Sequence, residues 1–183
     1  EALLNATIFF DYRVLYGDEK LAYKLRHWLL SMTGGNPAFL KAMAANALDV
    51  SPPLGKIRDF ITDEDPKYPG SIDLKKFGAR LFVDAARVLA LRTGVDATST
   101  VQRLRQGGLR IGMPAEELSA MADGFHFIQL LRLRHQQLDT DPGAPGDNRV
   151  KPDDLNELDR RILKEAFRPA RKIQLRLKLD YQI

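Results

Sequence analysis

Apolar side chains recur every three or four residues along most of the chain, and this spacing is typical of one face of an α-helix. The segment around residues 79–93 is apolar nearly all round, which favours a central, buried helix. In the last segment the apolar positions form a seam suited to helix packing. The pattern predicts helices at about residues 19–32, 37–50, 79–93, 114–138 and 152–181, and a shorter one from Asp96 or Thr98 to Gly107-Gly108.

The first predicted helix carries a clear apolar stripe. Asp18 is a suitable N-cap for it, because a short acidic side chain can accept a hydrogen bond from the first turn. Four apolar residues then lie on one side of the helix: Leu21, Leu25, Trp28 and Leu29. This helix is therefore predicted to be amphipathic.

Three segments depart from the helical pattern. Residues 6–14 are β-branched and aromatic, which predicts a strand. Apolar residues between Leu54 and Leu74 flank a turn-rich stretch, which predicts a small hairpin with a long loop. Residues 139–150 are rich in Pro, Gly and Asp and are expected to form a flexible loop. The predicted fold is thus mainly α, a helical bundle with a small β-hairpin and an N-terminal strand.

Composition narrows the class of protein. The chain has 183 residues, of which 44% are hydrophobic, enough for one domain with a continuous core. There is no cysteine, which excludes disulfides and thiolate metal sites and leads us to expect a reducing, cytoplasmic compartment. No apolar run reaches the roughly 20 residues of a membrane span. The N-terminus lacks a signal peptide and a starting Met, so we expect a piece of a longer chain.

Charge and motifs exclude several functions. The net charge of +4 suits an anionic ligand, but without a dense basic block it favours a solvated surface over a nucleic-acid-binding face. The sequence contains no phosphate-binding loop, dinucleotide fingerprint, paired-histidine zinc motif or nucleophile elbow. A self-sufficient active site is therefore not expected.

Asp11 is unusual, because it is a carboxylate inside an apolar segment. Such a group is costly to bury unless it binds a cation or a hydrogen-bond donor. One interpretation is an ion pair with Arg13, which shares its face of the predicted strand. The other is a metal ligand whose partners lie elsewhere, and the pattern does not choose between the two.

Two further clusters of charge stand out. Asp84 and Arg87 are neighbours within the apolar helix, and an ion pair is the favoured interpretation because buried charges must pair. Arg132 and His135 continue the apolar stripe of the long helix and should face the bundle interior. Arg132 is predicted either to cap neighbouring helix ends or to clamp a phosphate or carboxylate.

The order of segments resembles the substrate-binding domain that follows the catalytic domain in bacterial nucleotidyltransferases, many of which carry cyclic-nucleotide-binding and CBS domains upstream. Five segments carry the resemblance, at residues 8–18, 70–76, 86–91, 99–104 and 131–136. A more distant likeness is to glutamine synthetase adenylyltransferase. Lys75 stands where that enzyme has an acidic residue and Ser99 where it has asparagine, so glutamine synthetase is not implied as the substrate.

The resemblance implies a division of the chain into residues 1–17, the last strand of a nucleotidyltransferase domain, and residues 18–183, a helical substrate-binding domain. Asp11 then matches the third catalytic carboxylate of polymerase-β-type nucleotidyltransferases, which hold Mg²⁺ and the NTP. The first two carboxylates are absent here, so we expect this chain to be inactive alone and to bind no cofactor tightly. The resemblance suggests these residues for the substrate cleft: Arg13, Asp73, Arg87, Arg103, Arg132 and His135.

Two functions remain open from the sequence. The first is recognition of the acceptor, which is unidentified and could be a protein, by a domain that packs beside the catalytic domain. The second is a regulatory or protein-interaction helical module in a bacterial signalling protein.

Overall fold

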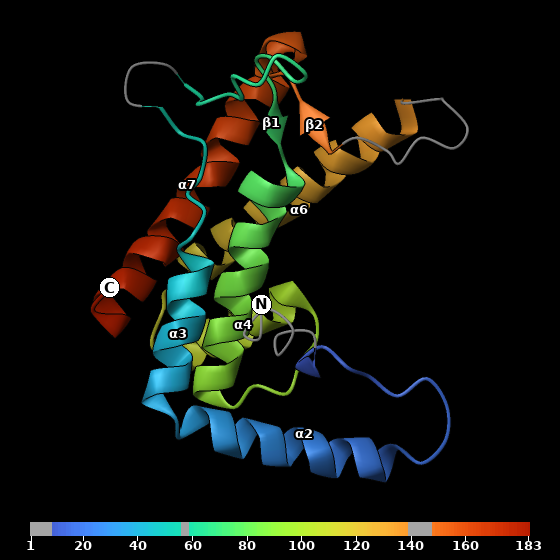
Figure 1. Ribbon diagram of the computed structural model, residues 1–183, viewed down its shortest axis with the longest axis vertical. Coiled ribbons are helices and arrows are strands. Elements are labelled where there is room, and N and C mark those ends of the chain that lie inside the picture. Colours follow the sequence, from blue (N-terminus) through green and yellow to red (C-terminus); the bar gives the residue numbers. More distant parts are fainter. Residues whose placement is uncertain (1–8, 56–58, 139–147) are drawn as a thin grey trace.

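The computed structural model describes residues 9–55, 59–138 and 148–183. Six α-helices lie wholly within these ranges (Figure 1), which confirms the mainly α fold. They are α2 (Glu19–Gly34), α3 (Pro37–Ala47), α4 (Arg80–Thr93), α5 (Thr100–Arg110), α6 (Ala115–Leu138) and α7 (Glu157–Tyr181). Shorter elements are the strands β1 (Ile72–Asp73) and β2 (Arg149–Val150), the π-helical turn η1 (Lys75–Ala79) and the 3₁₀ turn η2 (Pro152–Asp154).

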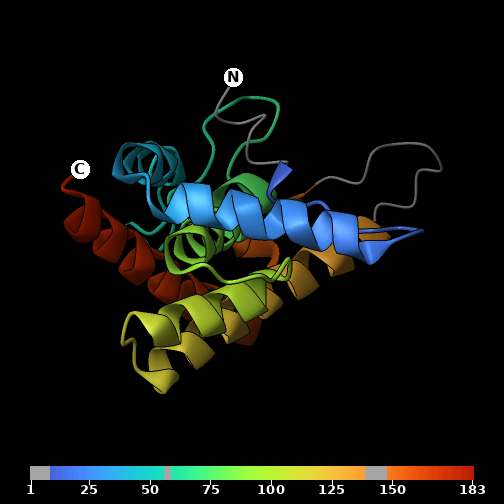
Figure 2. The same ribbon diagram turned by 90° about the horizontal axis from the view of Figure 1, so that it is seen from below.

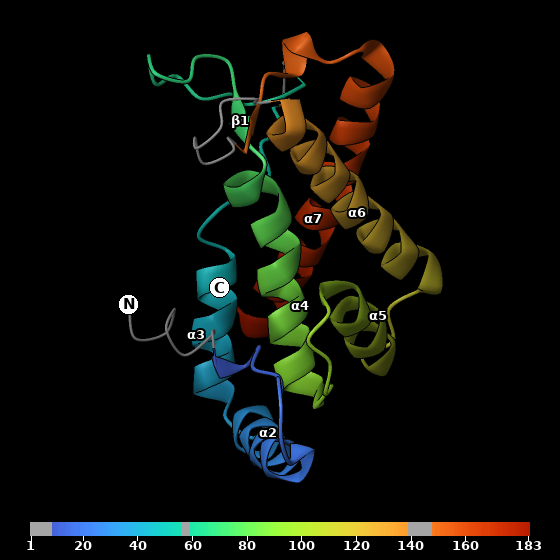
Figure 3. The ribbon, with the colours of Figure 1, turned by 90° about the vertical axis from the view of Figure 1, so that its right-hand side faces the viewer.

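Helix α4 runs through the middle of the molecule, with α3 on one side and α5 and α6 on the other (Figure 3). Its buried side chains occur on all sides of the helix, as the apolar sequence of this segment predicts. The described part of α4 buries more residues than any other described helix. Each fully buried large apolar side chain contributes about 1.5–3 kcal/mol. The most buried are Leu81, Phe82, Ala85, Ala86, Val88 and Leu89.

Helix α2 lies across one end of α4 at the edge of the bundle (Figure 2). Asp18 caps it as predicted, with its carboxylate accepting a hydrogen bond from the backbone N–H of Lys20. Helices α6 and α7 pack against each other on the other side of the core. No described helix has the length and apolar character needed to cross a membrane.

Helix α5 differs from its prediction at both ends. Its N-cap is Ser99, and it continues through Gly107 and Gly108 to Arg110. These glycines lie where α5 meets its neighbours: a Cβ on Gly107 would be 3.1 Å from the Leu89 Cβ, and one on Gly108 would be 2.3 Å from a Leu118 methyl. They permit close helix packing and do not end the helix.

The predicted hairpin between Leu54 and Leu74 is wrong in its pairing. Strand β1 instead pairs antiparallel with β2, with Ile72 opposite Val150 and Asp73 opposite Arg149. Leu54 forms only an isolated bridge with Phe60. Both Ile72 and Val150 are almost completely buried, so tertiary packing fixes a pairing that two-residue strands cannot specify in the sequence.

The predicted N-terminal strand at residues 6–14 lies partly outside the described residues, which begin at Phe9. From there the chain turns at Phe10 and Asp11 and continues to Asp18 without regular secondary structure. Arginine side chains bind its carbonyls: Arg103 donates to the oxygen of Phe10 and Arg26 to that of Tyr12. The described part of the segment is therefore not a strand.

Candidate functional site

Six of the seven residues predicted for the site fall into two groups. Asp11, Arg87 and Arg103 form the first, which we call the arginine pair site. Asp73, Arg132 and His135 belong to the second, at the small sheet, which we call the sheet site. Arg13 is exposed and belongs to neither. Between Asp73 in β1 and Arg87 in α4 the chain passes through η1 and the first half of α4, a helical length of roughly 18 Å, so the two sites are distinct.

In the arginine pair site, two guanidinium groups close on one carboxylate. Arg87, from α4, donates from Nη2 to Asp11 Oδ2 at 2.5 Å, and Arg103, from α5, donates from Nη1 to Asp11 Oδ1 at 2.5 Å. Arg103 also donates from Nε to the carbonyl of Ala97. Arg87 is 9% and Arg103 5% exposed, and a buried positive charge is destabilising unless a negative charge compensates it. The carboxylate of Asp11 supplies this negative charge.

A second carboxylate extends this network. Arg87 Nη1 lies 3.2 Å from Asp84 Oδ1, which confirms the predicted Asp84–Arg87 ion pair, and Arg80 Nε lies 3.0 Å from Asp84 Oδ2. Burial raises the pKa of Asp84 above its usual value, more than Arg80 and Arg87 lower it. Arg87 therefore bridges two carboxylates inside the fold.

The pKa values of Asp11 and Arg103 reflect their mutual contact. Burial by itself raises the pKa of Asp11, but the hydrogen bonds and charges of Arg87 and Arg103 together outweigh it and hold this pKa below its usual value. Burial lowers the pKa of Arg103, an effect that Asp11 opposes. The ion-pair interpretation of Asp11 therefore describes its geometry, with Arg87 and Arg103 as partners in place of Arg13.

The residues around Asp11 do not fit a Mg²⁺ ion. Both carboxylate oxygens accept hydrogen bonds from guanidinium groups, whose positive charge would repel a cation. The described residues also contain no cluster of three acidic or histidine side chains able to hold a metal. The metal-ligand interpretation of Asp11 stays a prediction without support from this geometry.

In the sheet site, Arg132 binds neutral amides. Its Nε and Nη2 donate to Asn148 Oδ1 at 3.0 and 2.6 Å, and its Nη1 donates to Gln129 Oε1. Gln136 donates to the same Asn148 oxygen at 3.1 Å. The positive charge of Arg132 thus has no carboxylate partner among the residues that the structure describes.

The backbone of Asn148 connects Arg132 to the other predicted residues. Its carbonyl accepts a hydrogen bond from the N–H of Leu74, directly after β1. Asp73 accepts hydrogen bonds from the N–H groups of Lys75 and Lys76 and so starts the turn η1. His135 is half-buried on α6, three residues after Arg132.

Sequence reasoning missed Asn148, the residue that orients Arg132. It lies in a stretch predicted as a loop, and nothing local indicates contact with a helix. The sequence offers one indication of a polar cluster at this place. On α6, Gln129 and Gln136 lie three residues before and four after Arg132, so the three side chains share one face of the helix.

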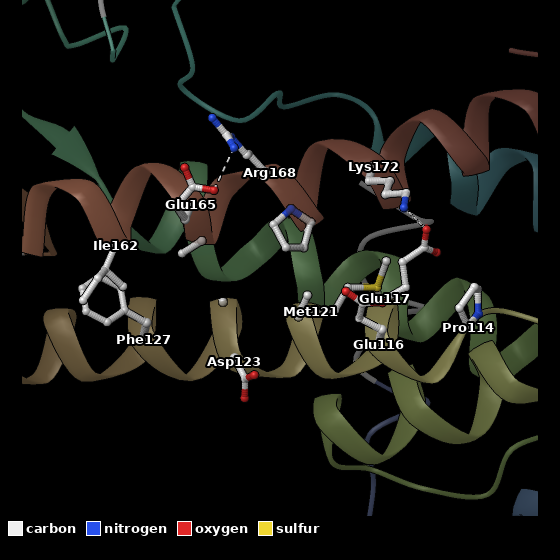
Figure 4. A pocket seen from close by; sticks show the side chains of 14 residues that line it. Pro114, Glu116, Glu117, Met121, Asp123, Phe127, Ile162, Glu165, Arg168 and Lys172 are labelled. Atoms are coloured by element: carbon white, nitrogen blue, oxygen red, sulfur yellow. Dashed lines mark ion pairs between the residues drawn. The ribbon is translucent and has the colours of Figure 1, made fainter.

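Between α6 and α7 lies a groove of about 610 Å³ (Figure 4). Its apolar lining includes Met121, Phe127 and Ile162. Two ion pairs also line it, that of Glu165 with Arg168 on α7 and that of Lys172 on α7 with Glu117 on α6. None of the seven predicted residues lines it. Its mixed apolar and charged lining distinguishes it from both sites.

Comparison with known proteins identifies the family. Neither the curated proteins nor the solved structures gave a match. A family model described as "Putative nucleotidyltransferase substrate binding domain" matches residues 37–181, from the start of α3 to the end of α7. This range includes every residue of both sites except Asp11. The chain therefore belongs to the nucleotidyltransferase substrate binding domain family.

Proposed function

We propose that this chain recognises the acceptor substrate of a polymerase-β-type nucleotidyltransferase, and that a separate catalytic domain holds the NTP and Mg²⁺ and transfers the nucleotidyl group. Family membership supports the general role. The observation that carries the finer proposal is Arg132, a half-buried cation held by amides without a carboxylate partner among the described residues.

This arrangement suits an anionic group on the acceptor. Asn148 and Gln129 orient the guanidinium but leave its charge uncompensated. A phosphate or carboxylate would supply that charge and accept paired hydrogen bonds from the planar group. Because the amides fix the side chain beforehand, little conformational freedom is lost on binding. We assign to His135, about one turn along α6, a second polar contact with the acceptor.

The arginine pair site has a positioning role in this proposal. Arg87 and Arg103 belong to the matched family region, whereas Asp11 precedes it. Their ion pairs attach residues 9–17 to the helical domain of residues 18–183. In the proposed enzyme they would set the orientation of the neighbouring catalytic domain, and Asp11 has no catalytic step here.

A second candidate is a regulatory or protein-interaction module, which the exposed apolar face of α2 favours. Cyclic-nucleotide-binding and CBS domains are the proposed regulatory partners in a bacterial signalling protein. The absence of cysteine supports the cytoplasm as the proposed location.

The proposal is tested first by asking which part binds the nucleotide. Calorimetric titration of this chain with each NTP and Mg²⁺ should give no binding in the micromolar range. A protein that joins this chain to its catalytic domain should transfer label from an α-labelled NTP to an acceptor, identified by mass spectrometry. Tight binding of NTP by the chain alone would contradict the division of roles.

A further inference from the structure

Helix α2 exposes an unusual amount of apolar surface. Leu21 is 71%, Leu25 49%, Trp28 57% and Met32 58% exposed. These are large side chains, and contiguous exposed apolar surface on a folded protein commonly marks an interaction site. We call these four residues the α2 stripe.

The spacing of the α2 stripe is that of a helix-pairing seam. Its members are separated by four, three and four residues, which is the a/d repeat by which two helices pack side by side. The bundle uses a neighbouring face of α2: Thr33 is buried, Leu30 packs against the core, and Arg26 pairs with Asp96. The stripe is therefore left free by the contacts of α2 within the fold.

We infer that the α2 stripe is a dimer interface, on which the α2 helix of a second copy of this chain packs in antiparallel orientation. A stripe with this repeat is complementary to itself, as a twofold interface requires. With the twofold axis between Leu25 and Trp28, Trp28 faces the smaller Leu25 of the partner subunit. A parallel pair would instead set the two Trp28 rings against each other, and would lack the favourable alignment of antiparallel helix dipoles.

The area of the stripe predicts a weak dimer. Its four side chains expose roughly 400 Å², since a large apolar side chain has about 150–250 Å² of surface. A standard specific interface buries about 800 Å² on each partner. The stems of Lys20 and Lys24 beside the stripe can add to this area. We expect a dissociation constant in the range of about 1–100 µM.

Charge gives the interface a distinctive salt response. Lys24 flanks the stripe, and in the antiparallel pair its two copies lie roughly 8 Å apart along the helix axes, so the interface brings positive charges together. Because salt screens such repulsion over about 8 Å at 0.15 M, added NaCl should strengthen the dimer. An interface held by opposite charges would instead weaken as NaCl is added.

The first experiment measures association of the intact chain. Trp28 is the only tryptophan, so its fluorescence reports directly on the stripe. Sedimentation equilibrium should give a monomer–dimer equilibrium, and the Trp emission should shift to longer wavelength on dilution. Leu25→Lys should weaken association roughly 100-fold or more, since each dimer contains the change twice. Leu175→Lys, at a similarly exposed leucine on α7, should leave association unchanged.

A second experiment tests the orientation. The chain has no cysteine, so single Cys variants cross-link only where they are placed. In the antiparallel pair Leu21 faces Met32 of the partner subunit, whereas the two copies of residue 21 are separated by roughly 16 Å, beyond disulfide reach. A mixture of L21C and M32C should form heterodisulfides on oxidation, and neither variant alone should do so.

The inference would be overturned if the chain is a monomer at about 200 µM and Trp28 has the emission of a water-exposed indole. The stripe would then be available to bind another domain. A dimer that survives Leu25→Lys would also overturn the inference. Cross-linking of L21C alone would refute the antiparallel orientation.

Discussion

Replacing Asp11 by asparagine tests the arginine pair site. The change keeps the size of the side chain but removes the charge that faces Arg87 and Arg103. Losing one partner of a buried ion pair costs about 3–5 kcal/mol, because the remaining charge is left buried without compensation. The Asp11 side chain is 37% exposed, and solvent screening lowers this cost to about 2–3 kcal/mol.

In a chain of this length, a loss of this size lowers Tm by about 5–10 °C. Urea unfolding of Asp11→Asn, Arg103→Gln and the double variant gives the coupling free energy directly. We expect a coupling of about 2 kcal/mol. Asp49→Asn, at an exposed aspartate, serves as the control and should change stability by less than about 0.5 kcal/mol.

The dependence of stability on pH follows from the lowered pKa of Asp11. The folded-state pKa of Asp11 is lowered, so its contribution to stability is complete above the unfolded pKa of about 3.9. This contribution is lost as the pH falls toward the folded pKa. The stability difference between the wild type and Asp11→Asn should stay constant from pH 7 to about 5 and shrink below about 4. A coupling near zero, or a difference that grows on acidification, would refute the ion-pair description.

Other substitutions test the packing that holds the sites. In Gly124→Ala the new Cβ would lie 2.8 Å from the Ala166 carbonyl oxygen on α7, so overpacking should outweigh the gain in helix propensity and destabilise the chain by about 1–2 kcal/mol in urea unfolding. Gly35→Ala, whose nearest contact would be 3.7 Å, should be close to neutral; equal effects would argue against the close α6–α7 approach. Gln174→Leu removes the donor to the carbonyls of Ala47 and Val50 and should cost about 2–3 kcal/mol; an unchanged Tm would contradict this role.

Local patterns were sufficient to predict much of the fold. The central position of α4 follows from its apolar sequence, because a helix that is apolar on all sides is stable only where other elements cover all of its faces. The Asp84–Arg87 pair is predictable because three residues along a helix bring side chains together. These features depend only on neighbours in the sequence.

Features that depend on distant residues could not be predicted in the same way. Asp11 and Arg87 each stand out as charges among apolar residues, but 76 positions separate them. Their contact depends on how the N-terminal segment crosses α4 and α5. The partner of β1 and the role of Asn148 depend likewise on the return of the chain after residue 147. Short strands and single amides carry no periodic signal that would reveal these contacts.

The most direct test of acceptor recognition is a kinetic comparison in a protein that joins this chain to the catalytic domain that we propose for it. Arg132→Gln removes the charge that we assign to the acceptor, and Arg134→Gln removes a more exposed charge two residues away. We predict that Arg132→Gln raises KM for the acceptor at least about 10-fold and leaves KM for the NTP unchanged, and that Arg134→Gln changes neither. Equal acceptor KM values for the wild type and Arg132→Gln, or a rise in the KM for the NTP instead, would contradict the proposed function.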